Sequence, residues 1–184
     1  FDAHGYQWAA IGAGGRNGVL IASRVGLDAP LLGLPAASVA AASPVQADDP
    51  DLSEEPRLIA ARCAGIQIAS VYVPNGREVG SGYWRAKLRW MEALAHWSRE
   101  ALTTGPLILG GDFNVAPRDE DVWDPAALVG ATHVSKEERE ARERALRSAM
   151  QEGDKRPLTL DSDEVLLDAE AYVSEPESQE PLDA

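Results

Sequence analysis

The sequence has one cysteine, no long hydrophobic run and few basic residues, and each shortage excludes a class of protein. The single cysteine, Cys63, excludes an internal disulfide and a zinc site built from paired cysteines. The longest apolar runs, such as 107–109 and 19–22, are far shorter than the roughly 18 residues that a membrane-spanning helix needs. Together these absences predict a protein of the reducing cytoplasm.

Basic residues are outnumbered, with 17 Lys and Arg against 30 Asp and Glu, for a formal net charge of −13. Such a balance argues against a nucleic-acid partner, because proteins bind phosphates mainly through Lys and Arg. The charge is uneven, however, and residues 151–184 hold eleven of the acids and two of the bases. Between Arg77 and Arg99, five basic residues are interleaved with four aromatic ones and two acids. This stretch is the candidate for contact with phosphates.

The length of 184 residues and the 45% hydrophobic content fit one globular domain or a little more. They exclude collagen-like, coiled-coil and fully disordered chains. We expect a folded core over residues 1–150 and a divergent acidic tail over 151–184. Because the chain begins at Phe1 and shows no signal region, we also expect it to start inside a larger reading frame.

The pattern of apolar residues alternates between strand-like and helix-like segments. Short apolar runs predict strands at 18–23, 57–63, 66–73 and 107–109, the second and third forming a hairpin across Ala64-Gly65. A helical period predicts helices at 83–102 and 135–150, and Glu137 or Glu138 is placed like the acid of a capping box at the start of the second helix. Residues 28–56 are expected to form a long loop. Strands mixed with helices predict a layered α/β sandwich, with two packed mixed β-sheets flanked by helices.

Two motifs carry little functional information by themselves. The glycine-rich segment 12–18 invites a phosphate-binding interpretation, but a strand-like run follows it where a helix would be needed, so a plain turn is favoured. His96 and His133 fit no catalytic pattern and are interpreted as structural or exposed.

Asp112 and Asn114 lie two residues apart at the end of a buried strand, so both side chains can point to one face. A carboxylate can orient or deprotonate a water, and a carboxamide can hydrogen-bond a phosphate oxygen or a metal-bound water. The Gly-Asp-Phe-Asn string is also a common turn signal, and spacing alone leaves both interpretations open.

A longer set of motifs resembles the exonuclease III branch of the endonuclease/exonuclease/phosphatase superfamily. Its elements are Ser70-Val-Tyr72-Val-Pro74-Asn75-Gly76, then Lys87 in a Trp-rich helix, then Leu109-Gly-Gly-Asp112-Phe-Asn114-Val-Ala-Pro117 and Asp121-Val-Trp123-Asp124-Pro125. Order and spacing agree over roughly residues 5–147, and Asn17-Gly18-Val19 and Glu55-Pro56-Arg57 also fit. The resemblance implies Mg²⁺-dependent (or Mn²⁺-dependent) hydrolysis of phosphodiesters in double-stranded DNA, as a 3′-to-5′ exonuclease and as an endonuclease at abasic sites in DNA repair.

The resemblance also implies roles for individual residues. Asp112 matches the residue that activates the attacking water, Asn114 the one that stabilises the transition state, and Tyr72 the one that hydrogen-bonds the scissile phosphate. Predicted contacts to the DNA backbone are Arg57, Asn75, Arg85, Lys87 and Arg89, and predicted metal ligands are Asp112, Asn114 and Asp163. Alternatively, Tyr72 is a half-buried core residue and Lys87 lies on a solvated helix face.

The resemblance is incomplete at both ends of the chain. The given residues ahead of Asn17-Gly18-Val19 contain no counterpart of the family's metal-binding Gln-Glu pair, and the family's closing Ser-Asp-His motif has only faint echoes near Asp163 and Pro181. A catalytically inactive remnant or a nucleic-acid-binding module of the same family is therefore the alternative to an active nuclease. A phosphatase acting on a small phosphorylated substrate is disfavoured by the Tyr-Val-Pro-Asn-Gly and Trp-Asp-Pro elements.

Overall fold

The computed structural model describes residues 1–15 and 17–150, which belong to one compact unit. Its strands are β1 (Gln7–Gly12), β2 (Gly18–Ser23), β3 (Asp28–Leu32), β4 (Leu58–Cys63), β5 (Ile66–Tyr72) and β6 (Leu107–Asp112). Its helices are α1 (Ala36–Ala40), α2 (Gly82–Leu102) and α3 (Lys136–Ser148), with short 3₁₀ turns at Asp2–His4 and Asp119–Asp121. None of the helices in this described part is long and apolar enough to span a membrane.

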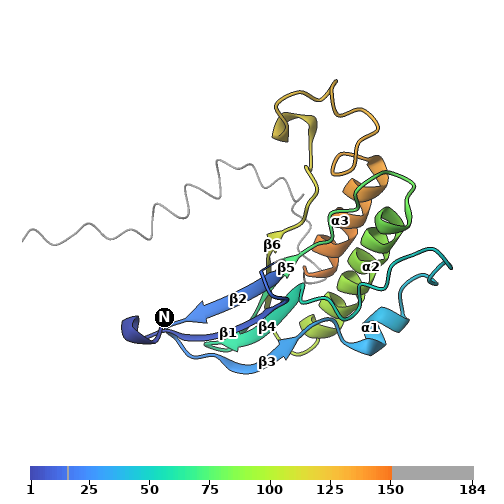
Figure 1. Cartoon of the computed structure of the whole chain (residues 1–184). Coiled ribbons are helices and arrows are strands. Elements are labelled where there is room, and N and C mark those ends of the chain that lie inside the picture. The colour runs from blue at the N-terminus through green and yellow to red at the C-terminus, as the bar shows by residue number, and fades with distance from the viewer. Residues whose placement is uncertain (16, 151–184) are drawn as a thin grey trace, which may run out of the picture. The chain divides into compact units, whose positions relative to one another are not determined.

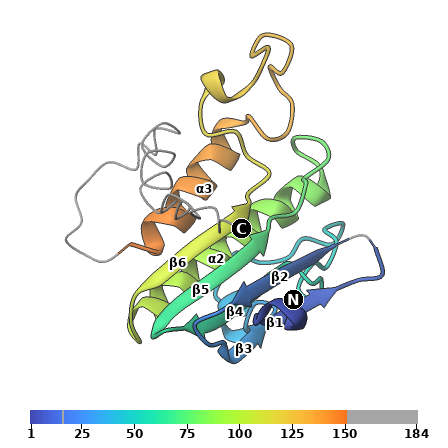
Figure 2. The ribbon, with the colours of Figure 1, turned by 90° about the vertical axis from the view of Figure 1, so that its left-hand side faces the viewer.

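The strands form two sheets. β1 and β2 pair as an antiparallel hairpin, and the larger sheet has the order β3-β4-β5-β6, in which only β5 and β6 are parallel. The hairpin contacts β4 and β5 on one face of the larger sheet, and α2 and α3 cover the other face (Figures 1 and 2). The predicted layered α/β sandwich is confirmed, with a smaller sheet that is purely antiparallel.

The prediction of a long loop over residues 28–56 is wrong in part, because β3 and α1 lie inside it. β3 pairs with β4 at the edge of the sheet, and its register shifts between Asp28 and Leu31. Four of its five residues are exposed, so no alternation of apolar and polar residues marks the strand. The sequence did not predict β1 for the same reason, since four of its six residues are exposed.

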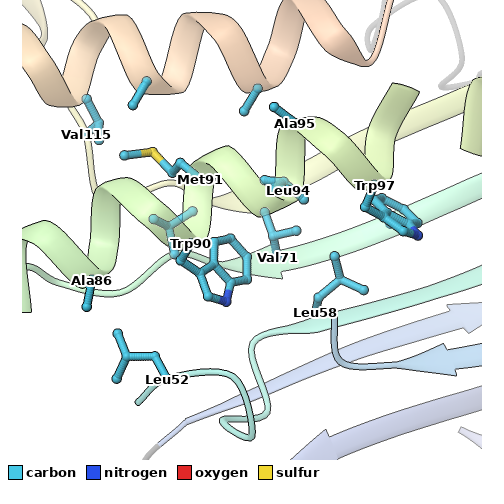
Figure 3. Packing of buried hydrophobic residues seen from close by; sticks show 14 of the residues in the cluster. Leu52, Leu58, Val71, Ala86, Trp90, Met91, Leu94, Ala95, Trp97 and Val115 are labelled. Carbon is cyan, nitrogen blue, oxygen red and sulfur yellow. The ribbon is translucent and has the colours of Figure 1, made fainter. Parts of the chain in front are cut away.

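The main core lies between the larger sheet and α2. Figure 3 shows Trp90 and Leu94 projecting from α2 toward the strand that carries Val71, and Met91 projecting toward Val115 and α3. The predicted helix is confirmed, and it begins after Ser81, whose hydroxyl accepts a hydrogen bond from the backbone N–H of Trp84. This core holds α2 against the sheet as the connection between the parallel strands β5 and β6.

A buried ion pair joins α2 to α3. Lys87 Nζ lies 2.5 Å from Glu138 Oε1, and neither side chain has any exposed surface. Glu138, one of the two residues that the sequence allowed as the acid of a capping box, completes that box with Ser135 at the start of α3. Burial disfavours the charge of Glu138, but hydrogen bonds from Lys87, Ser135 and Thr132 outweigh burial and lower the pKa of its carboxyl. Burial also lowers the pKa of Lys87, although Glu138 opposes this effect.

Gly111 supplies the first test of the fold. Its φ of 133° lies where L side chains are rare, and a Cβ there would overlap the carbonyl oxygen of Val71 on β5. We expect Gly111→Ala to lower the free energy of unfolding by about 2–4 kcal/mol, measured by urea denaturation. The matched control is Gly110→Ala, because open space surrounds a Cβ at Gly110 and the change should stay within about 0.5 kcal/mol. Equal losses in the two variants would contradict this explanation.

Glu138→Gln tests the buried ion pair. At neutral pH this variant leaves the Lys87 ammonium buried without a counter-charge, and we expect unfolding to become easier by about 3–5 kcal/mol. The pKa of Glu138 is lower in the folded chain than its ordinary value of 4.5, so its ionised form stabilises the fold above that pH. This contribution is lost as the pH falls below 4.5. Urea denaturation across this pH range should show the two proteins converging, and a constant difference would contradict the prediction.

Candidate active site at the carboxyl ends of β5 and β6

The parallel pairing of β5 and β6 brings Tyr72 and Asp112 together. They are direct register partners at the carboxyl ends of the two strands. Paired residues of neighbouring strands project to the same face of a sheet, and here Tyr72 packs against the apolar cluster beneath the β1–β2 hairpin. Tyr72 is half-buried and Asp112 is exposed. The structure therefore places the predicted phosphate ligand beside the predicted water-activating carboxylate.

Asn114 follows Asp112 in a left-handed backbone conformation, with a φ of 50°. Its backbone N–H donates to Asp112 Oδ1 at 2.8 Å, and its Nδ2 donates to the carbonyl oxygen of Val73 at 2.8 Å. The first bond fixes the orientation of the Asp112 carboxylate, and the second fixes the Asn114 carboxamide against β5. One N–H of the carboxamide remains for another partner.

The backbone carbonyl oxygen of Asn114 accepts two hydrogen bonds from side chains. One comes from Lys87 Nζ at 2.7 Å and the other from His133 Nδ1 at 2.5 Å. Because a carbonyl oxygen can only accept, the hydrogen of a neutral His133 ring lies on Nδ1. Its Nε2 then accepts from Asn75 Nδ2, 3.2 Å away. His133 therefore ties two predicted site residues, Asn75 and Asn114, together.

Sequence reasoning gave His133, Thr132 and Glu138 no part in the site. His133 lies 19 residues beyond Asn114, and no short motif or hydrophobic period links the two. The one sequence signal in this region was the capping-box position of Glu137 or Glu138, which predicted a helix start and no contact with Lys87. Contacts of this kind depend on how the loop after β6 returns to α3.

Arg57, which directly precedes the neighbouring strand β4, supports Tyr72. Its Nη1 donates to the carbonyl oxygen of Tyr72 at 3.1 Å, and its guanidinium lies 5.0 Å from the centre of the Tyr72 ring. Glu55 Oε2 accepts from Arg57 Nε at 2.5 Å and from Asn17 Nδ2 at 3.0 Å. Arg57 is only 8% exposed, so its charge is committed to Tyr72 and Glu55. The resemblance implied that Arg57 contacts the DNA backbone. In the structure Arg57 is buried and bonded to groups within the protein.

Lys87 requires a correction. Both interpretations drawn from the sequence, a contact to the DNA backbone and a solvated helix face, need an exposed side chain, but Lys87 has none. The helical period turns it toward α3 and the loop after β6, where it pairs with Glu138 and Asn114. Its ammonium is therefore not placed to touch a DNA phosphate.

Arg85 and Arg89 lie on a different side of α2 and are paired with acids. Arg85 contacts Asp48 at 2.8 Å and Asp49 at 2.9 Å, and Arg89 contacts Asp49 at 2.8 Å. Burial opposes the charge of Asp49, but hydrogen bonds from the Gln46 backbone and from both arginines outweigh it and lower its pKa. The loop before β4 thus neutralises two of the five basic residues in the stretch that the sequence singled out, Arg85 and Arg89.

The described residues do not supply a complete metal site. Within residues 1–15 and 17–150, no group of three or more His, Cys, Asp or Glu side chains could hold a metal ion. Asp112 contributes a carboxylate, but its Oδ1 already accepts the N–H of Asn114. The third predicted ligand, Asp163, lies outside the described residues. These donors by themselves do not fit Mg²⁺, which prefers several oxygen ligands in octahedral geometry.

Comparison with known proteins gives relatives of consistent kind. The model of the endonuclease/exonuclease/phosphatase family matches residues 2–160. An exodeoxyribonuclease of Bacillus subtilis (strain 168) is 34% identical over 88 residues, which make up 48% of this chain and 34% of that protein. The chain therefore spans about a third of the length of this curated relative.

Solved structures agree with this family. An AP endonuclease from Archaeoglobus fulgidus superposes with a TM-score of 0.66 at 31% identity, covering 79% of this chain and 52% of the other. A 3′ phosphatase from Neisseria bound to a product DNA hairpin superposes with a TM-score of 0.67 at 32% identity, covering 80% of this chain and 52% of the other. A 3′-5′ exonuclease from Neisseria meningitidis superposes with a TM-score of 0.66 at 32% identity, covering 80% of this chain and 53% of the other. The chain matches about half the length of each of these structures. Because the family model matches most of the residues of this chain, the chain belongs to the endonuclease/exonuclease/phosphatase family.

Proposed function

We propose that this chain carries the Tyr72, Asp112 and Asn114 part of a DNA phosphodiesterase site with a role in DNA repair. The observation that carries the proposal is the register of β5 and β6, which pairs Tyr72 directly with Asp112 at the sheet edge. Relatives described as exodeoxyribonuclease, AP endonuclease and 3′-5′ exonuclease support DNA as the substrate. Double-stranded DNA with an abasic site, or with a processable 3′ end, is the proposed substrate class.

The proposed chemistry gives each of these three side chains a task at the attacking water or the phosphate. Asp112 Oδ2 has no hydrogen-bond partner among the described residues and accepts a proton from the attacking water. The water oxygen bonds to phosphorus as the bond to the leaving oxygen breaks. The second N–H of the Asn114 carboxamide and the hydroxyl of Tyr72 donate to non-bridging phosphate oxygens, where negative charge grows.

A divalent cation enters the proposal through family membership. Mg²⁺ or Mn²⁺ would neutralise charge on the phosphate, and Asp112, Asn114 and Asp163 stay its predicted ligands. Since the described residues do not fit the ion by themselves, the chain needs further donors for this activity.

The incomplete metal site of the described residues favours a second candidate function. A member of this family without a complete metal site would bind nucleic acid and leave it intact. Exposed Asn75, beside His133 at the sheet edge, is the predicted DNA contact best placed for this role.

The first functional test compares the chain with its Asp112→Asn variant on a labelled duplex that contains one abasic site. We expect incision with Mg²⁺, no incision with chelator, and a loss of at least about a hundredfold in the variant, because Asn accepts a proton poorly. Gel analysis of the products measures the rate. The matched control is Asp28→Asn, an exposed aspartate of β3 with the same change in charge. No incision by the folded wild-type chain would overturn the nuclease proposal in favour of the binding module.

The second test concerns the arginines of α2. Each phosphate contact adds about 0.9 to the slope of log binding constant against log salt. Because Arg85 and Arg89 are paired with Asp48 and Asp49, we expect Arg85→Gln with Arg89→Gln to change the slope by less than about 0.5. Fluorescence anisotropy with a labelled duplex, over a series of salt concentrations, measures the slope. A decrease of nearly two units would restore both arginines as phosphate contacts.

A further inference from the structure

We propose that Lys87, held in place by Glu138, is a positioning residue that orients Asn114 and, through it, the Asp112 carboxylate. The functional meaning of this assignment rests on the proposed phosphodiesterase site. Its structural content does not, because it concerns contacts within the chain. The inference replaces the DNA contact that the sequence predicted for the same lysine.

All the hydrogen-bonding capacity of the Lys87 ammonium is used inside the protein. Its Nζ lies 2.7 Å from the carbonyl oxygen of Asn114, 3.4 Å from that of Asn75 and 2.5 Å from Glu138 Oε1. An ammonium has three N–H donors, and each has an acceptor here. No donor is left for a phosphate. Two of the three acceptors are backbone carbonyls of the loops that bear predicted site residues.

Glu138 fixes the lysine in this arrangement. Its Oε1 also lies 2.8 Å from the hydroxyl of Thr132, and its Oε2 accepts from the hydroxyl of Ser135 at 2.6 Å. The carboxylate is therefore held at both oxygens by the start of α3 and the loop before it. Because Glu138 and Lys87 are fully buried, water does not compete for these bonds.

The bond from Lys87 to Asn114 matters because of the backbone conformation of Asn114. A left-handed conformation is costly for residues other than glycine, although Asn tolerates it better than most. Hydrogen bonds from Lys87 and His133 to the same carbonyl stabilise this conformation. The conformation in turn aims the Asn114 N–H at Asp112 Oδ1. A path of direct contacts thus runs from the buried pair to the carboxylate.

The alternative is that the pair simply joins α2 to α3. The pair formed by Arg89 and Asp49 shows what such a contact looks like. It ties the same helix to a loop through a nearly buried carboxylate and touches neither Asp112 nor Asn114. Lys87 differs because its bonds continue into the site loops.

The test uses the full chain carrying Lys87→Met together with Glu138→Gln. The double variant leaves no buried charge unpaired, and replacing buried ion pairs by neutral groups is often tolerated. We expect hydrogen exchange at the backbone amide of Asn114 to become about tenfold faster, while amides of β4 and β5 such as Ala60 and Ala69 keep their rates. NMR of the ¹⁵N-labelled chain measures each amide.

A matched control separates positioning from general loss of stability. Leu94→Ala removes a fully buried apolar side chain from the same helix, without touching Asn114. It should speed exchange across the core and leave Asn114 no faster than its neighbours. An unchanged Asn114 rate in the folded double variant would overturn the inference, and so would a uniform change in which Asn114 and the core amides move together.

Cleavage kinetics give an independent readout if the wild-type chain cleaves DNA. A positioning role predicts that the double variant loses about tenfold or more in kcat with KM nearly unchanged. A raised KM with unchanged kcat would instead make Lys87 a substrate contact and overturn the inference. If the wild-type chain cleaves nothing, the proposed function fails, and the exchange rates still decide whether Lys87 positions Asn114.

Discussion

Lys87 and Glu138 bring opposite charges into the interior at the point where α2, α3 and the loops of the candidate site meet. Removing two ions from water costs several kcal/mol each, and their mutual attraction offsets this only when the remaining donors and acceptors are satisfied. Here Asn75, Asn114, Thr132 and Ser135 satisfy them. The buried pair is therefore stable only while those four residues keep these positions. The pair thus constrains the loops of the site and also joins α2 to α3.

The sheet supplies the second constraint on the site. Because β5 and β6 are parallel, their carboxyl ends meet at one edge, and the register sets Tyr72 beside Asp112. Gly111, which directly precedes Asp112, lets β6 approach the backbone of Val71 closely. The hairpin β1–β2 then covers the face on which Tyr72 lies, and Asn17 in that hairpin reaches Arg57 through Glu55. The site is thus held from the helices and from the hairpin together.

The electrostatics of the described residues separate this chain from a simple basic DNA-binding surface. Arg85 and Arg89 of α2 are paired with Asp48 and Asp49, Arg57 is committed to Tyr72 and Glu55, and Lys87 is buried. In the proposed function we therefore expect polar groups at the sheet edge, such as Tyr72 and Asn75, to contribute to recognition of DNA. Within the described residues, Asp112 belongs to no group of three or more acidic, His or Cys side chains that could hold a metal ion.

The sequence by itself determined the elements with strong local signals: the apolar strands β4, β5 and β6, the amphipathic helix α2, the capping box of α3, and the motifs that name the family. Exposed strands such as β1 and β3 lack that signal, because a strand with little burial needs no apolar alternation. Sequence also placed Asp112 and Asn114 together, since they are two residues apart. Only the tertiary structure decided that Lys87 faces Glu138 and Asn114 and that His133 returns to Asn75. Those contacts join segments that lie 27 to 58 residues apart, and chain folding rather than local preference brings them together.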